Sequence, residues 1–320
     1  MKHLGNIIRK PPLRITSDPY LNMGERLLPF SDDFIQACNT FDYQDVKFYP
    51  FKLSKLIKAL GTDIIGPGSE YIIQKIIQHV DSNNILFLDP TWPMYEVYCQ
   101  INNKKYIKIK IKSFYDNPVN DLITNSSKND LIIINNPNSP FGHYLNQDEL
   151  DNFLYLAKNR YVLVDQAYLE FVDNDFDYNY FLNKYENLYF TRTFSKAYGL
   201  AGIRVGYCYT NNNLFKNCFD AFPISNNSIH IALQAIKKLN IKLYINKINK
   251  QKEKLYNLVN NYIPSNLYFF HVKDNDFLFK KLSKNIKYTT YNFDINRWCL
   301  LPILTSELIQ KYETIRKNAT

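Results

Sequence analysis

Cysteine and histidine are scarce in the sequence, and their spacing argues against several kinds of site. The five cysteines form no CxxC pair, so a disulfide framework and a zinc knuckle are both disfavoured. The five histidines share no metal-ligand spacing, and no metal site is predicted. The cysteines are expected to be small buried side chains. They are Cys38, Cys99, Cys208, Cys218 and Cys299.

Long apolar runs are also missing. No stretch approaches the roughly 18 apolar residues that a membrane span requires, and Leu131–Ile134 is only as long as a strand. Residues 1–10 carry charges at Lys2, Arg9 and Lys10, so they lack the apolar core of a signal peptide. These features predict a cytoplasmic protein with no membrane partner.

The overall composition is that of an ordinary globular protein. Hydrophobic residues make up 46% of the 320 residues and charged ones 22%, which argues against global disorder. The net charge of +9 comes mostly from scattered lysines. A solvated basic surface is therefore predicted in preference to a nucleic-acid interface. Arginine is scarce, so each arginine is weighed separately as a candidate site residue.

Short apolar runs alternate with helical patterns through the middle of the chain. Apolar spacing predicts helices at Glu70–Val80 and Gln147–Lys158, with Ser69 and Asn146 as N-caps. This alternation predicts a doubly wound, mostly parallel sheet that binds ligands beyond the carboxyl ends of its strands. The predicted strands are Ile85–Leu88, Tyr106–Ile111 at a half-exposed edge, Leu131–Ile134, Tyr161–Val164, Leu188–Phe190 and Val205–Tyr209.

The character of the sequence changes after about residue 212. A Lys-rich helix is predicted over Lys237–Tyr262, followed by short strands within residues 264–304 and a terminal helix near Ser306–Ile315. We therefore expect three parts: an N-terminal segment over residues 1–30, a large domain over 31–212, and a smaller α/β domain over 213–320.

The segment from Thr191 to Tyr207 carries the strongest chemical signal. Lys196 follows Ser195 in a turn after a buried strand, and Arg204 comes eight positions later. A lone lysine in a loop is usually a solvated charge, but this one lies where the sheet delivers its ligand-binding ends. A lysine that forms a Schiff base needs such a partly desolvated place. A phosphate beside it would be bound by hydroxyl groups and a guanidinium, which Thr193, Ser195 and Arg204 offer.

Three upstream segments complete the pattern. Asp165 ends a buried strand and Tyr168 comes three residues later; the aspartate could cap a helix, or pair with a protonated pyridine nitrogen. Residues 136–142 (NPNSPFG) have the composition of a turn. Residues 66–70 (GPGSE) precede a predicted helix and so present N–H groups to an anion.

In this order and spacing the segments resemble class I/II pyridoxal-phosphate aminotransferases, most closely the histidinol-phosphate aminotransferase-like branch. The resemblance runs from about Gly24 to Tyr209. It implies an aspartate-aminotransferase-like fold, in which a large domain with a mostly parallel central sheet is flanked by helices and followed by a smaller α/β C-terminal domain. Residues 1–30 would then cover the active site. The matching segments are GSE (68–70), DPTWPMYEVY (89–98), NNPNSPFG (135–142), VDQAYLEF (164–171) and the lysine segment.

The resemblance also implies roles for individual residues. Lys196 would hold pyridoxal 5′-phosphate (PLP) as a Schiff base and move the proton between the substrate Cα and the cofactor C4′. Asp165 would pair with the pyridinium nitrogen and keep the ring an electron acceptor, and Tyr168 would donate to the ring's phenolic oxygen. Trp92 would stack on the ring. Tyr49 would reach the phosphate of a neighbouring subunit, which implies a homodimer. The implied phosphate ligands are Arg204, Ser195, Thr193, Gly68, Ser69 and Glu70, the last two through their amides.

The sequence departs from the family pattern at several places. The usual Asn that binds the ring oxygen is replaced by Ser139, and Asn138 could substitute for it. The usual Thr and Glu are replaced by Phe141 and Gln166. The arginine that clamps the donor's carboxylate falls on Leu301 in one register and on Arg297 in another; we expect Arg297. Arg26, with Arg14, lies where the family covers its substrate.

The resemblance implies a ping-pong transaminase. The amino donor would be an amino acid, expected to be glutamate, and the acceptor a small, possibly phosphorylated, oxo-compound. An alternative on the same scaffold is decarboxylation of a phosphorylated amino acid. A further alternative is a non-catalytic member that acts as a binding protein, which Ser139 and Phe141 would suit.

Overall fold

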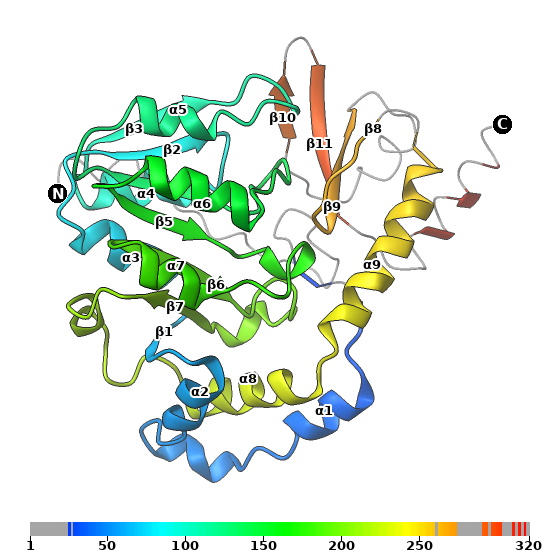
Figure 1. Ribbon diagram of the computed structural model, residues 1–320. Helices are drawn as coiled ribbons and strands as arrows, with labels where there is room; N and C mark the ends of the chain where they lie inside the picture. Colours follow the sequence, from blue (N-terminus) through cyan, green and yellow to red (C-terminus); the bar gives the residue numbers. More distant parts are fainter. Residues whose placement is uncertain are drawn as a thin grey trace.

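A seven-stranded sheet organises most of the chain (Figure 1). The structure is a computed structural model that describes residues 25–26, 28–259, 262–273, 290–293, 296–302 and isolated positions between 309 and 317. The strand order is β1-β7-β6-β5-β4-β2-β3. From β6 to β3 the neighbours are parallel, and β7 is antiparallel to β6 and β1. The strands are β1 (Ile64–Gly66), β2 (Ile85–Asp89), β3 (Tyr106–Lys110), β4 (Leu131–Asn135), β5 (Tyr161–Asp165), β6 (Leu188–Thr193) and β7 (Gly206–Thr210).

This architecture confirms the predicted mostly parallel sheet and all six predicted strands to within a few residues. The four strands β2, β4, β5 and β6 are buried almost throughout. Strand β3 lies at the edge and is half exposed, as its period-two pattern indicated.

Helices cover both faces of the sheet. They are α1 (Asp32–Cys38), α2 (Leu53–Leu60), α3 (Ser69–His79), α4 (Met94–Ile101), α5 (Val119–Thr124), α6 (Gln147–Leu156), α7 (Tyr178–Lys184), α8 (Asn226–Lys238) and α9 (Ile241–Tyr256). Short 3₁₀ turns occur at η1 (Tyr43–Lys47), η2 (Leu169–Phe171), η3 (Ala201–Ile203) and η4 (Phe215–Cys218).

Two predictions about helix ends had different outcomes. Asn146 caps α6 in a capping box with Glu149, as predicted. Ser69 was expected to cap α3 but is its first helical residue; Gly68, at φ 85°, is the N-cap. A glycine takes that place because its positive φ brings the chain into the helix without steric cost.

The helix predicted over Lys237–Tyr262 is confirmed as α9, which is shorter at both ends (Ile241–Tyr256). A separate helix, α8, ends at Lys238, and Leu239 and Asn240 lie between the two. The Asn240 side chain accepts a hydrogen bond from the Leu243 amide and so starts a new helix. Because this N-cap lies inside a continuous apolar pattern, the prediction placed the start of the helix four residues too early.

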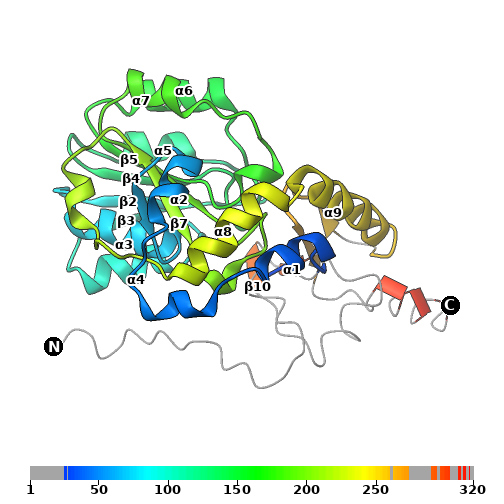
Figure 2. The same ribbon diagram turned by 90° about the horizontal axis from the view of Figure 1, so that it is seen from below.

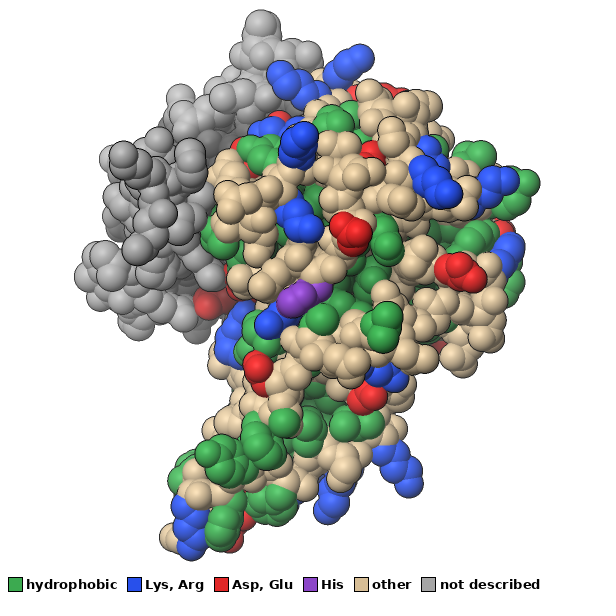
Figure 3. Space-filling model, turned by 90° about the vertical axis from the view of Figure 1, so that its left-hand side faces the viewer, with side chains coloured by type: hydrophobic (Ala, Val, Ile, Leu, Met, Phe, Trp, Pro, Cys, Tyr) green, Lys and Arg blue, Asp and Glu red, His purple; other side chains and the backbone are tan. Residues whose placement is uncertain are grey.

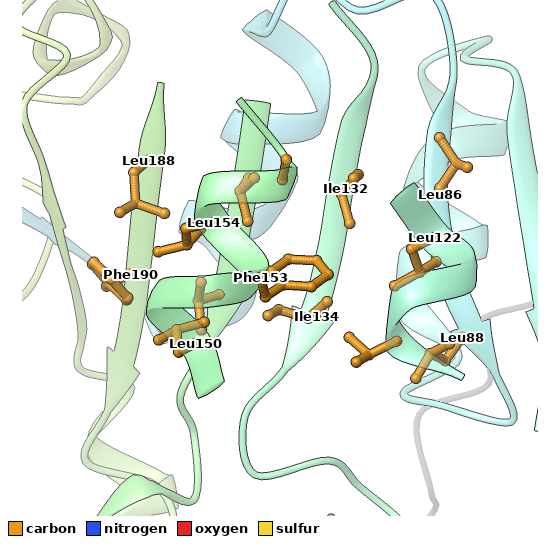
Figure 4. Packing of buried hydrophobic residues seen from close by; sticks show 14 of the residues in the cluster. Leu86, Leu88, Leu122, Ile132, Ile134, Leu150, Phe153, Leu154, Leu188 and Phe190 are labelled. Atoms are coloured by element: carbon orange, nitrogen blue, oxygen red, sulfur yellow. The ribbon is translucent and has the colours of Figure 1, made fainter. Parts of the chain in front are cut away.

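Alternating side chains on each strand face opposite layers of helices. Ile132, Ile134, Val162, Val164 and Phe190 pack on α5, α6 and α7, and Figure 4 shows Leu150, Phe153 and Leu154 of α6 against this face. The residues between them, such as Ile133, Leu163 and Tyr189, pack on α3 and α4. The face toward which a strand residue points therefore follows from its parity in the sequence.

The packing changes around Asn240. Residues 224–239 share a hydrophobic cluster with α1, α2 and the turn after β6. Helices α8 and α1 lie side by side in both ribbon views, below the sheet in Figure 1 and in front of it in Figure 2. Helix α9 instead packs on a second sheet of order β10-β11-β9-β8. Its strands are β8 (Tyr262–Ile263), β9 (Phe269–Lys273), β10 (Thr290–Phe293) and β11 (Asn296–Pro302). The domain boundary expected at residue 212 stays a prediction, and the expected helix at Ser306–Ile315 lies largely outside the described residues.

Within the described part of the chain, no helix has the length and apolar character needed to span a bilayer.

Candidate active site

Asp165 lies at the carboxyl end of β5, in the middle of the sheet. Its cross-strand neighbours are Asn135 of β4 and Thr191 of β6. The carboxylate is buried and accepts hydrogen bonds from four donors. These are Tyr95 Oη at 2.6 Å, Ala167 N at 3.2 Å, Asn135 Nδ2 at 3.3 Å and Thr191 Oγ1 at 3.5 Å. The site therefore holds an acid out of water but inside a ring of polar groups.

Burial and hydrogen bonding act on the pKa of Asp165 in opposite directions. Burial raises it above the usual value, while the bonds from Tyr95, Ala167 and Thr191 and the charge of Lys196 oppose that rise. The pKa of the Tyr95 phenol is raised well above its usual value, chiefly by burial and then by the carboxylate. Tyr95 consequently remains a donor to Asp165.

Lys196 follows β6 and is close enough to Asp165 for its charge to lower the pKa of the carboxyl group. Its Nζ lies 5.5 Å from the centre of the Tyr168 ring. Tyr168 is half-buried between the two sheets, where it stacks on Tyr268 with ring centres 5.8 Å apart. The structure thus brings Lys196, Asp165 and Tyr168 together, as the sequence predicted from their strand ends.

A second group of predicted residues forms a cup at the N-terminus of α3. A Cβ on Gly68 would lie 2.5 Å from Arg204 Nη2, and a Cβ on Gly206 would lie 2.1 Å from the Ser69 amide nitrogen. Gly206 pairs in turn with Thr193, whose hydroxyl donates to Ser195 Oγ at 2.9 Å. Helix amides, two hydroxyls and a guanidinium therefore meet at one place, which suits a bound anion.

Glu70 and Trp92 border this cup. Glu70 accepts from the Tyr98 hydroxyl, and its other oxygen lies 3.5 Å from Arg204 Nη2. Trp92 is half-buried and packs edge-on against Tyr95 at 5.2 Å between ring centres. Because Tyr95 bonds Asp165, Trp92 is placed beside the buried carboxylate.

Other predicted residues lie elsewhere or serve local packing. Tyr49 is 77% exposed and stacks on Phe222 at the surface. Arg26 donates to the carbonyls of Leu28 and Pro29 and lies 3.9 Å from the Tyr244 ring centre. Its guanidinium therefore holds the N-terminal segment against α9.

Asn138 and Ser139 were predicted to bind the ring oxygen, and Arg297 to clamp the donor's carboxylate. The Asn138 carboxamide accepts from the Phe141 amide inside its own turn, and Ser139 beside it is partly exposed. The backbone of Arg297 pairs with Asn292 in the second sheet, but its side chain lies outside the described residues. Their roles stay predictions.

Sequence reasoning missed the donors around Asp165. Tyr95, Asn135 and Thr191 received no role, although Tyr95 lies in the DPTWPMYEVY segment and Asn135 directly follows a predicted strand. Polar residues at strand ends were the available signal for Asn135 and Thr191. Nothing in the spacing indicated that an α4 tyrosine reaches β5. Among the described residues, no group of three or more His, Cys, Asp or Glu side chains is placed to hold a metal ion.

Phe141, which stands where the resemblance implies a Thr, joins the turn after β4 to the second sheet. It is buried, and its ring stacks with those of His143 and His271 at 5.7 and 5.9 Å between centres. Phe114 lies 4.7 Å from the His271 ring. The larger side chain is thus accommodated by an aromatic cluster between the two sheets.

We expect His271 to make the protein acid-sensitive. Burial, and then the charge of His143, lowers the pKa of His271 from 6.5 to about 3. The unfolded chain therefore takes up a proton below pH 6.5 that the folded chain refuses until about pH 3. As the pH is lowered from 6.5 to about 3, the free energy of unfolding should decrease, by up to about 1.4 kcal/mol per pH unit.

Chemical unfolding of the wild type and His271→Phe at several pH values measures this effect. In His271→Phe, the free energy of unfolding should depend less steeply on pH, by the contribution of one proton. His79→Gln, at an exposed position, should keep the pH dependence of the wild type. Identical slopes for His271→Phe and the wild type would contradict the expectation.

Comparisons with known proteins agree with this geometry. The family model for aminotransferases of class I and II matches residues 37–274. A histidinol-phosphate aminotransferase of Brachyspira hyodysenteriae is 29% identical over 330 residues, covering 93% of this chain and 92% of that protein. One from Clostridium beijerinckii is 30% identical over 234 residues, covering 68% of this chain and 64% of the relative, just under two thirds.

A solved structure extends the likeness to the fold. The crystal structure of histidinol-phosphate aminotransferase from Sinorhizobium meliloti, in complex with pyridoxal 5′-phosphate, matches with a TM-score of 0.78. The sequence identity is 18%, and the match covers 91% of this chain and 87% of that one. This likeness confirms the predicted aspartate-aminotransferase-like fold.

Proposed function

Because the chain belongs to the class I and II aminotransferase family and is a pyridoxal-phosphate-dependent transaminase, we propose that it moves an amino group from an amino acid to a small phosphorylated oxo-compound. The expected donor is glutamate, and the two half-reactions follow each other in a ping-pong sequence. The names of the relatives support a phosphorylated acceptor. The observation that carries the proposal is the buried Asp165 carboxylate beside Lys196 and the Gly68–Arg204 cup.

The residues present fit pyridoxal 5′-phosphate. The cup is crowded enough that a Cβ on Gly68 or Gly206 would strike its walls, so backbone amides can approach a phosphate closely. Thr193, Ser195, Arg204 and the amides of Ser69 and Glu70 would hold that phosphate. Asp165 would face the ring nitrogen, and Tyr168 and Trp92 would contact the ring.

When bound, the cofactor supplies an aldehyde that condenses with amines and a ring that accepts electrons from the substrate Cα. Lys196 Nζ would provide the amine that attaches it and would then move the Cα proton. Asp165 Oδ2, held by Tyr95 and Asn135, would stabilise a positive N–H group opposite it. The Tyr168 hydroxyl would donate to the ring's oxygen, and Tyr268 and Phe269, which pack on Tyr168, would help to exclude water.

Gly206→Ala should damage the cup specifically. The new methyl group would meet the Ser69 nitrogen and the Gly68 carbonyl carbon at 2.1 and 2.3 Å, so backbone must move. We expect a loss of about 1–3 kcal/mol in the free energy of unfolding and a cofactor Kd raised roughly tenfold, about the loss of one hydrogen bond.

Gly202→Ala is the matched control, because a Cβ there would meet nothing within 4 Å. Calorimetry and a fluorescence titration with the cofactor measure both effects. Equal cofactor affinity in the two variants would show that the cup does not bind the cofactor's phosphate.

A homodimer is the proposed assembly. A group of apolar side chains around η1 is exposed by 52–77%, and Figure 3 shows hydrophobic surface gathered on the lower lobe of the molecule. Burying this group against a second copy would remove apolar area from water, and Tyr49 would then reach the partner's phosphate. The group is Tyr43, Val46, Phe48, Tyr49, Phe51 and Phe222. A cytoplasmic location remains a prediction of the sequence.

A visible absorption spectrum of the purified protein tests the function. The bound cofactor should absorb in the visible range, and the band should shift on addition of the true donor and return on addition of a phosphorylated oxo-acid. Release of carbon dioxide without any oxo-acid would show a decarboxylase instead. Absence of any donor-induced shift across a panel of amino acids would favour a binding protein.

A further inference from the structure

Arg192 and Glu170 form a buried ion pair on the side of the sheet opposite to Asp165. Arg192 Nη2 lies 2.6 Å from Glu170 Oε1, and the two side chains are 11% and 9% exposed. Thr191 faces the buried Asp165 carboxylate and Thr193 faces the cup. Because side chains alternate along a strand, Arg192 points to the other layer. This parity gives Arg192 the same face as Phe190, whose ring packs in the core beside α6 (Figure 4).

Two further side chains extend this pair. Arg192 Nη1 donates to the Tyr178 hydroxyl, and that hydroxyl donates to Gln166 Oε1 at 2.9 Å. Gln166 is fully buried and directly follows Asp165. We call Gln166, Glu170, Tyr178 and Arg192 the Arg192 network.

The network joins the two segments that carry the site. Glu170 lies two residues after Tyr168 in the turn that follows β5, and Arg192 lies four residues before Lys196 on β6. The pKa of Tyr198, two residues after Lys196, is raised first by burial and then by the Glu170 carboxylate. Glu170 is therefore close to both segments.

The network is poorly built for stability. Gln166 Nε2, Glu170 Oε2 and Arg192 Nε are buried and, among the described residues, have no hydrogen-bond partner. Each such atom costs free energy, and a buried ion pair is often no more stabilising than apolar side chains of the same volume. The network is thus better suited to holding the turn after β5 and strand β6 in fixed relative positions than to stabilising the fold.

We propose that the Arg192 network consists of positioning residues, which set the distance between Lys196 and the Asp165–Tyr168 segment from the far side of the sheet. This rests on the proposed function, because the distance matters only if all three residues act on one cofactor. Loss of the network would leave every residue that contacts the cofactor unsubstituted but would let the Tyr168 hydroxyl move away from the ring's oxygen.

The double variant Glu170→Gln/Arg192→Met tests the proposal without leaving a buried unpaired charge. We expect it to fold and to attach the cofactor at Lys196, as borohydride reduction and peptide mass spectrometry would show. The midpoint of the cofactor's absorbance titration with pH should rise by about one unit, because a phenol that donates to the ring oxygen stabilises its deprotonated form. The cofactor Kd should rise roughly tenfold.

Arg160→Met is the matched control. Arg160 also donates to a serine hydroxyl and to backbone carbonyls, but at the amino end of β5, so its loss should lower thermal stability and leave the titration midpoint unchanged. Tyr178→Phe, which removes only the bridging hydroxyl, should shift the midpoint in the same direction by less, and keeps the test open if the double variant does not fold.

Two outcomes separate failure of the inference from failure of the function. If the variants lose stability while midpoint and Kd match the wild type, the network is merely structural and the inference is overturned. If the wild type itself attaches no cofactor, the proposed function fails, and the inference with it.

Discussion

Lys196→Ala should lose at least about four orders of magnitude in turnover, since one side chain provides both covalent attachment and proton transfer. The structure gives this lysine a setting that differs from that of the surface lysines. Its charge acts on the buried Asp165 and its Nζ lies 5.5 Å from the Tyr168 ring centre. The variant should still bind the cofactor through the cup, but without a covalent bond.

Turnover assays and borohydride reduction followed by mass spectrometry measure the two losses separately. Lys216→Ala, at an exposed lysine 3.2 Å from Asp63, is the control and should keep both. A small external amine should restore part of the turnover of Lys196→Ala, because it can take the proton in place of the missing side chain. Covalent attachment that survives the substitution would place the reactive amine elsewhere.

Asp165→Asn should lower turnover on the order of 10³-fold, the usual range for a charge aimed at a developing charge in a water-poor site. An amide cannot offset the positive charge on the ring nitrogen, although it fills the same volume. The same substitution should increase the free energy of unfolding of the cofactor-free protein at neutral pH. Burial raises the pKa of Asp165, so the folded chain holds its proton at higher pH than the unfolded chain does. Ionisation of this group at neutral pH therefore destabilises the fold, and the amide removes that cost. The NH₂ of the new amide can face the Tyr95 hydroxyl, which can turn to accept a hydrogen bond from it.

Asp130 offers a matched comparison at the opposite end of the same sheet. It is 1% exposed and accepts hydrogen bonds from the Asn84 and Ser127 amides. Asp130→Asn should lose about 1–3 kcal/mol in the free energy of unfolding, because an amide NH₂ can be forced against those donors, and should leave the cofactor spectrum unchanged. If Asp165→Asn kept normal turnover, or if both variants lost activity equally, the assigned role of Asp165 would be wrong.

The sheet was predictable because local patterns decide it. Buried parallel strands such as Leu131–Ile134 and Tyr161–Val164 are continuous apolar runs, and the alternation of Tyr106–Ile111 marked the exposed edge. Helix α9 was predictable from its apolar spacing, but its start was placed at Lys237 instead of Ile241, because the Asn240 N-cap lies within an unbroken apolar pattern. Gly68 rather than Ser69 caps α3 because the entry into that helix needs a positive φ.

Asp165, Tyr168 and Lys196 lie at or after the carboxyl ends of β5 and β6, so a common site for them was predictable, because parallel strands deliver these ends to one edge. Arg204 lies just before β7, and the antiparallel direction of β7 brings its start to the same edge. The environment of Asp165 was not predictable. Tyr95 lies 70 residues away in the sequence, Asn135 lies 30 and Thr191 lies 26. Parity along a strand tells which residues share a face. Only the order of the strands and the packing of α4 on the sheet decide which side chains surround the Asp165 carboxylate.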